Sequence, residues 1–217
     1  MLTADEFISF LATHRASAIL RTSVADAARP AMEAAVRGGF RIVEFTLTTP
    51  GALDLVGEFA MRKDLVVGAG TVLTPDEATA AVEAGARYLV SPVVDEAVID
   101  RARSLGVAMM PGTHTPTEML RAYRAGAQLQ KLFPAPGIGP AFVKACLGPL
   151  PFLRIVPTSG VDETNVAAYL AAGAFGVGFV APLFDPDDVA AGRYERIEQR
   201  ARALLGATAE CGTATNA

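Results

Sequence analysis

The sequence predicts a (β/α)8 barrel, and three observations support this fold class. Short apolar segments alternate with amphipathic ones along almost the whole chain, as in folds whose parallel strands are covered by helices. Glycine repeatedly separates an amphipathic segment from the next apolar one, where it can end a helix in the left-handed conformation. The apolar segments number eight, which closes a barrel. An open, doubly wound sheet is the alternative, but no Gly-x-Gly-x-x-Gly motif opens the first helix.

The eight apolar segments are the predicted strands. They lie at residues 16–21, 41–47, 65–70, 88–91, 107–111, 129–134, 153–158 and 175–180. Each is short and lies between two helical patterns, which is typical of parallel strands buried on both faces. We therefore expect eight parallel strands around a common interior.

Helical patterns precede and separate these strands. Residues 3–14 are predicted to form an extra N-terminal helix that caps the bottom of the barrel. Later helices open at Pro, Asp or Thr, as in TPDEA (74–78), TPTEM (115–119) and VDETN (161–165). Glycines such as Gly85 are expected to end them ahead of the next strand.

Length and composition indicate one globular domain. With 217 residues, of which 51% are hydrophobic, the chain can bury a large core. We predict a single barrel domain over residues 1–206. Residues 207–217 show no periodicity and are predicted to be a disordered tail.

Charge and cysteine content exclude several classes of protein. The net charge is -4, and the scattered Lys and Arg residues form neither a patch for nucleic acid nor a membrane anchor. Cys146 and Cys211 lie far apart, and the first residues lack the features of a signal peptide, so we expect a cytoplasmic protein. With His14 and His114 as the two histidines, a histidine-rich metal site is not expected.

Polar side chains stand where the predicted strands end, and barrels of this kind gather their reactive groups there. These positions are occupied by Arg21, Glu44, Thr46, Thr48, Thr71, Ser91, Pro92, Thr113, His114, Lys131, Thr158, Ser159 and Gly160. A lysine, a glutamate and an arginine are therefore predicted to meet among hydroxyl groups at one mouth of the barrel.

Lys131 is the most informative of these residues. It lies on an apolar strand and shares one face, at a spacing of two, with Leu129 and Phe133. Loss of water disfavours the ammonium form, and a nearby Arg21 would do the same, so we expect a nucleophilic amine. The alternative is a lysine that extends its amine from a strand end into solvent.

Glu44 shares the barrel-facing side of the second strand with Ile42 and Thr46. A carboxyl group among such neighbours should hold its proton more strongly than usual, which suits a general acid and base. The alternative is a structural ion-pair partner of Arg21 or Lys131.

Six segments, in register and spanning nearly the whole chain, resemble one enzyme family. The segments are VEFTLTTP, GAGTVL, SP, MPGT, KLFPAPGIGP and PTSGV. Together they resemble the 2-keto-3-deoxy-6-phosphogluconate and 4-hydroxy-2-oxoglutarate aldolases. AILR, KLFP and GP are similar to the 2-keto-3-deoxy-6-phosphogalactonate aldolase branch.

The resemblance implies the chemistry of a class I aldolase. Lys131 would form a Schiff base with a keto-acid, and Glu44 would move protons. The substrate would be a 2-keto-3-deoxy sugar acid, phosphorylated or not, or 4-hydroxy-2-oxoglutarate, and the products would be pyruvate and an aldehyde. Neither a metal nor another cofactor would be needed. The resemblance also implies a homotrimer.

The substrate-binding residues depart from the family in one respect. The gluconate branch has an arginine four residues after its glutamate, and Thr48 stands at that position. We expect Arg21, whose planar fork matches a carboxylate, to replace it with help from Thr71. A surface arginine and a helix-capping threonine are the alternatives. Pro92 and Phe133 would line the apolar wall, or serve core packing alone.

The expected phosphate subsite also departs from the family. The resemblance implies a Gly-Gly pair after the seventh strand and a Gly-Ser pair after the eighth, both binding phosphate through backbone donors. Here the first position reads Ser159-Gly160, and the second reads Val180-Ala181. Thr158, Ser159 and Gly160 would still contact the distal part of the substrate. We therefore expect weaker binding of phosphorylated substrates, and a keto-acid that lacks phosphate or has a different shape is favoured.

Three other functions remain open at this point. An imine on Lys131 also permits decarboxylation of oxaloacetate. A phosphate-binding barrel isomerase or synthase would use no covalent intermediate, and a barrel that has lost activity would only bind a keto-acid.

Overall fold

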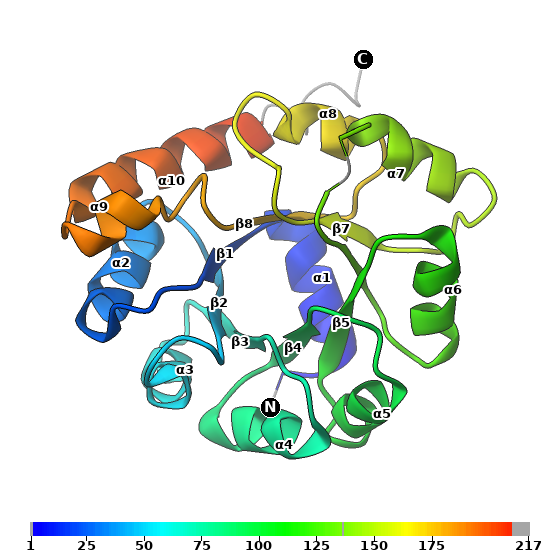
Figure 1. The fold of residues 1–217 in the computed structure, drawn as a ribbon, viewed down its shortest axis with the longest axis horizontal. Coiled ribbons are helices and arrows are strands. Elements are labelled where there is room, and N and C mark those ends of the chain that lie inside the picture. The colour runs from blue at the N-terminus through cyan, green and yellow to red at the C-terminus, as the bar shows by residue number, and fades with distance from the viewer. Residues whose placement is uncertain (1, 136, 210–217) are drawn as a thin grey trace.

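The computed structural model describes residues 2–135 and 137–209 of the chain. The described residues form one sheet of eight parallel strands surrounded by helices (Figure 1). The strands are β1 (Ala16–Leu20), β2 (Ile42–Thr46), β3 (Val66–Gly70), β4 (Tyr88–Ser91), β5 (Ala108–Thr113), β6 (Gln130–Leu132), β7 (Ile155–Pro157) and β8 (Val177–Phe179). The predicted barrel is therefore confirmed.

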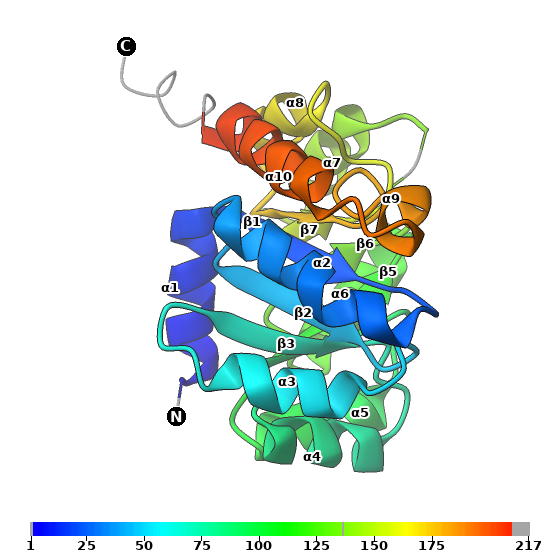
Figure 2. The ribbon, with the colours of Figure 1, turned by 90° about the vertical axis from the view of Figure 1, so that its left-hand side faces the viewer.

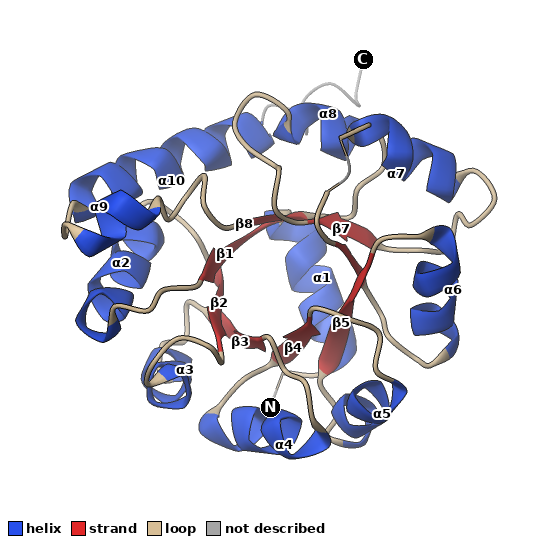
Figure 3. Ribbon diagram, in the orientation of Figure 1, coloured by secondary structure: helices blue, strands red, loops and turns tan. Residues whose placement is uncertain are grey.

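Ten helices alternate with these strands or flank them in the described part of the chain. They are α1 (Ala4–His14), α2 (Ala25–Arg37), α3 (Ala52–Ala60), α4 (Pro75–Ala84), α5 (Glu96–Ser104), α6 (Pro116–Arg124), α7 (Pro140–Leu147), α8 (Val166–Ala171), α9 (Pro186–Ala190) and α10 (Tyr194–Ala209). Figure 3 shows α2 to α10 around the outside of the strands, whereas α1 is seen through the ring that the strands form. None of them combines the length and the apolar character that crossing a bilayer requires, as far as the described ranges extend.

The sheet closes on itself. The strand order runs from β7 down to β1 and then to β8, so β7 and β8 are the two edges. A parallel bridge between Thr158 and Gly178 joins these edges. The closed sheet has one inner face, on which every second residue of each strand lies.

Helix α1 plugs the end of the barrel where the strands begin (Figure 2). Thr3 caps this helix, because its hydroxyl accepts from the Glu6 backbone and the Glu6 carboxylate accepts from the Thr3 backbone. The buried face of α1 carries Phe7 and Leu11, and the Phe7 ring stacks on Tyr88 inside the barrel at 4.3 Å between centroids. The expected cap at the barrel bottom is therefore confirmed.

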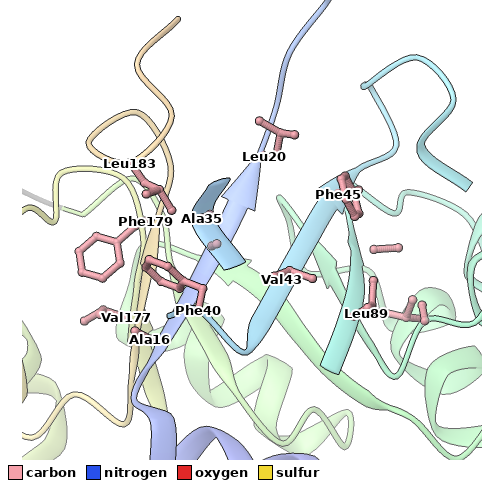
Figure 4. Close-up of a cluster of buried hydrophobic side chains, with 14 of the residues drawn as sticks. Ala16, Leu20, Ala35, Phe40, Val43, Phe45, Leu89, Val177, Phe179 and Leu183 are labelled. Atoms are coloured by element: carbon pink, nitrogen blue, oxygen red, sulfur yellow. The ribbon is translucent and has the colours of Figure 1, made fainter. Parts of the chain in front are cut away.

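The larger hydrophobic core lies between the outer face of the strands and the helices. Figure 4 shows Leu20, Val43 and Phe179 from three strands in this layer, with Phe40 beside them. The rings of Phe40 and Phe179 meet edge to face at 6.1 Å between centroids. Burial of each such side chain contributes roughly 1.5–3 kcal/mol, so this layer fixes the strand ends on which the site is built.

The ends of the helices follow the predicted punctuation, with one correction at the C-terminus. Gly85 ends α4 with φ at 121°, a conformation that few other residues adopt without strain. Helix α10 extends to Ala209, so residues 207–209 are helical, although we predicted a disordered tail there. Thr208 is buried, and its hydroxyl donates to the Leu204 carbonyl. Residues 210–217 lie outside the described residues.

Candidate active site

Lys131 lies on β6 with its side chain inside the barrel, where it is 6% exposed. Strand β6 is held from both sides. The Thr113 hydroxyl donates to the Lys131 carbonyl at 3.0 Å, and the Gln130 carboxamide oxygen accepts from the Arg154 backbone at 2.9 Å. The Lys131 Nζ lies 4.9 Å from the centroid of the Phe133 ring. The amine is thus fixed in a largely apolar setting.

Burial lowers the pKa of Lys131, and the positive charge of Arg21 acts in the same direction. The Glu44 carboxyl opposes this shift. Since removal from water is the largest influence, the neutral form of the amine is favoured relative to a lysine in solvent. A neutral amine is the form that can attack a ketone.

Glu44 lies on β2 and is fully buried. Neither of its carboxyl oxygens has a hydrogen-bond partner within the described part of the chain. Burial raises its pKa, while the charges of Lys131 and Arg21 work against the rise. An unpartnered buried carboxyl group is costly to the fold, and a buried group with a shifted pKa is a candidate for a functional site.

Two glycines of β3 make the room for this carboxyl group. A Cβ atom on Gly70 would lie 2.0 Å from Glu44 Oε1, and one on Gly68 would lie 2.4 Å from the Tyr88 ring. The register places Glu44 beside Gly68, and both belong to the inner face. In the sequence, GAGTVL (68–73) indicates the family, but the motif itself does not show which residue its glycines face. Gly68 and Gly70 are two residues apart, so both lie on the same face of β3. This spacing is the signal in the sequence that β3 has no side chains there and leaves space for those of neighbouring strands.

Tyr88 forms the floor beneath Glu44. Its hydroxyl donates to the Val43 carbonyl at 3.1 Å, and its ring separates Glu44 from Phe7 of α1. Burial, followed by the neighbouring Glu44 carboxyl, raises the pKa of Tyr88 well above its usual value. The tyrosine therefore stays neutral at the buried end of the site.

Arg21 and Thr71 meet at the open mouth. Arg21 follows β1 and is exposed, and its Nη2 donates to the Thr71 hydroxyl at 3.1 Å. Thr71 follows β3 with φ at 60°, in the left-handed region where a β-branched residue is strained. This strained backbone aims the Thr71 hydroxyl at the guanidinium group.

Three threonine hydroxyl groups form a chain on the neighbouring β2–α3 loop. The buried Thr46 hydroxyl lies 3.0 Å from that of Thr48 and 3.2 Å from that of Thr49. The Thr49 hydroxyl also accepts from the backbone of Thr22, the residue after Arg21, at 3.4 Å. Thr46 and Thr48 were predicted at this mouth from the sequence, whereas Thr49 was not.

Pro92 and Phe133 are half-buried at the ends of β4 and β6. The Pro92 backbone passes close over β5, because a Cβ atom on Gly112 would lie 2.2 Å from the Pro92 carbonyl oxygen. Phe133 packs beneath the Lys131 amine. Both residues thus lie beside the interior in which Lys131 stands.

Thr158, Ser159 and Gly160 follow β7 on the side of the barrel that Thr158 joins to β8. Thr158 is fully buried, whereas Gly160 is exposed. Ser159 has φ at 63° and Gly160 has φ at 90°, so the serine takes a backbone conformation that favours glycine. The Ser159 carbonyl accepts from Ala135 of the β6–α7 loop at 3.0 Å.

The segment after β8 is closed on itself. The Val180 carbonyl accepts from the backbones of Leu183 at 3.1 Å and Phe184 at 2.7 Å. Pro182, which precedes Leu183, has no backbone N–H group. Beyond Ala181 this turn therefore presents no unbonded backbone donor up to Phe184.

Comparison with known proteins gives this arrangement a family. A family model described as KDPG and KHG aldolase matches residues 8–200. The chain is 38% identical to a "Probable 2-dehydro-3-deoxy-6-phosphogalactonate aldolase" of Rhizobium meliloti (strain 1021), over 88% of this chain and 89% of the relative. It is 34% identical to the 2-dehydro-3-deoxy-6-phosphogalactonate aldolase of Escherichia coli (strain K12), over 89% of this chain and 94% of the relative.

Solved structures agree with these relatives. The native KDPGal structure superposes with a TM-score of 0.83 at 32% identity, covering 91% of this chain and 96% of the other. The KDPG aldolase of Legionella pneumophila, with pyruvate captured as a covalent carbinolamine intermediate, superposes with a TM-score of 0.82 at 26% identity. It covers 91% of this chain and 97% of the other. The resemblance seen in six segments is confirmed, and the chain belongs to the KDPG and KHG aldolase family and is a class I, pyruvate-dependent aldolase.

Proposed function

We propose that Lys131 is the Schiff-base lysine and Glu44 the proton carrier in the cleavage of a 2-keto-3-deoxy acid to pyruvate and an aldehyde. The observation that supports this assignment best is the pairing of two buried groups inside one barrel. Burial lowers the pKa of the Lys131 amine and raises the pKa of the Glu44 carboxyl, so both neutral forms are favoured. A neutral amine with a protonated acid is the combination that imine formation needs.

The reaction follows from these two states. The Lys131 amine attacks C2 of the keto-acid, and Glu44 gives a proton to the departing hydroxyl, which leaves as water. The resulting protonated imine withdraws electrons while the Glu44 carboxylate accepts the proton of the C4 hydroxyl group. The bond between C3 and C4 then breaks to release the aldehyde. Protonation of the enamine at C3 and hydrolysis of the imine return pyruvate and the free amine.

The remaining site residues bind the substrate in this proposal. Arg21 and Thr71 hold the carboxylate beside the ketone, since a guanidinium and a hydroxyl group already meet at 3.1 Å there. Pro92 and Phe133 form the apolar wall that excludes water from the imine. Distal atoms of the substrate would contact Thr158 and the Ser159–Gly160 backbone.

Trapping with pyruvate and borohydride tests the assignment of the lysine. Reduction of the imine should leave a stable pyruvate adduct on the wild-type protein, visible as one mass increase in the intact chain. The Lys131→Ala variant should form no adduct, whereas Lys144→Ala, which removes an exposed lysine on α7, should form it normally. A wild-type protein without an adduct would refute covalent catalysis.

We further propose that the substrate lacks a phosphate group. The turn after β8 has Val180 and Ala181 in place of a Gly-Ser pair, and Val180 accepts the backbone donors of Leu183 and Phe184. Ser159, in the loop after β7, has a positive φ that favours glycine. The part of the subsite after β7 could therefore still bind an anion. We expect a higher kcat/KM for 2-keto-3-deoxygluconate than for its 6-phosphate. A strong preference for the phosphate ester would refute this choice.

The assembly and the cellular setting are also proposals. We propose a single-domain chain that forms a cytoplasmic homotrimer and binds neither nucleic acid nor membranes. The trimer is what the resemblance to the aldolases implies, and the net charge of -4 supports the absence of nucleic acid. Light scattering after size-exclusion chromatography should give three times the chain mass of 22.6 kDa, and a monomer would contradict the proposal.

A further inference from the structure

The β1–α2 loop, which starts at Arg21, has little packing to hold it in place. Arg21, Ser23 and Val24 are exposed, and Thr22 is half-buried. On one side the loop borders a cavity of about 520 Å³ that separates it from α9. Figures 1 and 2 both show α9 next to this loop. Since most of the loop is exposed and one side of it borders this cavity, the hydrogen bonds of Arg21 and Thr22 contribute to the position of Arg21.

Two hydrogen bonds join the first residues of this loop to the loops that follow β3 and β2. The Arg21 side chain donates to Thr71, beyond β3. The Thr22 backbone donates to the Thr49 hydroxyl, beyond β2, at 3.4 Å. The first joins side chains, whereas the second holds the backbone on which Arg21 stands.

Thr49 is suited to hold that backbone because it is itself fixed. It is 2% exposed, and its hydroxyl oxygen lies 3.2 Å from that of Thr46, which is 1% exposed. Since the Thr49 oxygen accepts from Thr22, its own proton can go to Thr46, and the Thr46 proton can go to Thr48 at 3.0 Å. Hydrogen bonds in such a chain strengthen one another.

We propose that Thr49, supported by Thr46, is a positioning residue for substrate binding: it holds the β1–α2 loop so that Arg21 faces the substrate carboxylate. The inference rests on the proposed role of Arg21. It also explains how Arg21 of the β1–α2 loop can serve, although the position after β2 where the gluconate branch has its arginine is occupied by Thr48. Thr49 does not touch the substrate, so its influence passes through Arg21.

The test is a double-mutant cycle read out by pyruvate trapping. The half-saturating pyruvate concentration for borohydride trapping should rise about three- to tenfold in Thr49→Val, because the loss of one hydrogen bond has an effect of this size. The extent of trapping at saturating pyruvate should stay unchanged. Thr49→Ser, which keeps the hydroxyl group, should stay within about twofold of the wild type.

Dependence on Arg21 separates positioning from a general loss of structure. In an Arg21→Ala background, Thr49→Val should add no further change, since the group that it positions is gone. Thr208→Val is the matched control, because it removes another buried threonine hydroxyl bond, within α10, and should leave trapping as in the wild type. Thermal unfolding of each variant confirms that it is folded.

The outcomes separate this inference from the proposed function. An unchanged half-saturation in Thr49→Val, or an equal rise with and without Arg21, would overturn the positioning role while trapping on Lys131 still stands. A wild type that forms no adduct, or an Arg21→Ala variant with unchanged half-saturation, would overturn the proposed roles and this inference together.

Discussion

Glu44 and Asp188 are both buried carboxyl groups, and the protein treats them in opposite ways. Glu44 lies inside the barrel with 0% exposure and no hydrogen-bond partner among the described residues. Asp188 lies on α9, facing α10, with 3% exposure. Burial raises the pKa of Glu44, whereas the pKa of Asp188 falls to about 2.

The difference comes from their partners. Asp188 accepts from Arg193, from Arg200 at 2.5 Å and from Arg196 at 3.5 Å. Hydrogen bonds from Arg193 and then Arg200 are the largest causes of its lowered pKa. The carboxylate of Asp188 is thus locked in its charged form and ties α9 to α10. Burial with partners makes a structural carboxylate, and burial without them makes one that can exchange a proton.

The strongest test of this contrast is Glu44→Gln. We expect kcat for aldol cleavage to fall about 10²- to 10⁴-fold, because an amide cannot transfer the proton. The free energy of unfolding should not fall, because the variant removes a buried carboxyl group that has no partner. Steady-state kinetics and urea unfolding measure both. A kcat close to the wild type would show that Glu44 is a structural residue after all.

Gly70→Ala should have the next largest effect on activity. The added methyl group would lie 2.0 Å from Glu44 Oε1, so the carboxyl group has to move. A displacement near 1 Å in a catalytic group lowers the rate about 10²-fold. Gly206→Ala, on α10 with open space around it, is the control and should keep full activity. Equal kcat values in the two variants would contradict the requirement for an empty position on β3.

Thr71→Gly extends the comparison of the two carboxyl groups to a polar group that a strained backbone holds in place, rather than burial or ion pairs. Glycine accepts φ near 60° freely, so strain of about 1–3 kcal/mol is relieved and is partly offset by the flexibility of glycine. We expect Tm to be unchanged or higher. The half-saturating pyruvate concentration for borohydride trapping should rise about tenfold, because the hydroxyl group is lost. A lower Tm with unchanged half-saturation would reverse this interpretation.

Asp188→Asn should have the smallest effect on activity and a clear effect on stability. The folded pKa of about 2 lies below the ordinary value of 3.8, so ionised Asp188 stabilises the fold above pH 4. This contribution is lost as the pH falls from about 4 towards 2. We expect a lower Tm for the variant at pH 7 and a difference from the wild type that shrinks towards pH 2, with kcat near the wild-type value. A constant difference in Tm across this range would contradict the assigned pKa.

The fold was predictable because local signals agreed with one another. Spacing by two residues placed Glu44 and Lys131 on the inner face, and the helix over 3–14 was found from its own pattern. The end of α10 was not predicted. The sequence near Thr208 shows no periodic apolar face, so it gave no sign that Thr208 would be buried in α10.

The site was predictable only in part. Residue types and motifs indicated an amine, a carboxyl group and an arginine at one mouth of the barrel. Which residues lie next to each of these groups depends on the register between strands, which the motifs do not give. Glu44 lies beside Gly68, and the two glycines of β3 leave volume that their own positions in the chain do not reveal. The same is true of Thr49, whose contact with Thr22 joins loops that are 27 residues apart.

By itself, the sequence determined the alternation of strands and helices, the face on which each strand residue lies, and the family to which the chain belongs. The tertiary structure alone decided which buried carboxyl group is charged, which glycine makes room for Glu44, and which hydroxyl group holds the Arg21 loop. The physical reason is that periodicity is a property of neighbouring residues in the chain. Desolvation, unfilled volume and hydrogen-bond partners arise between segments that meet only when the barrel closes.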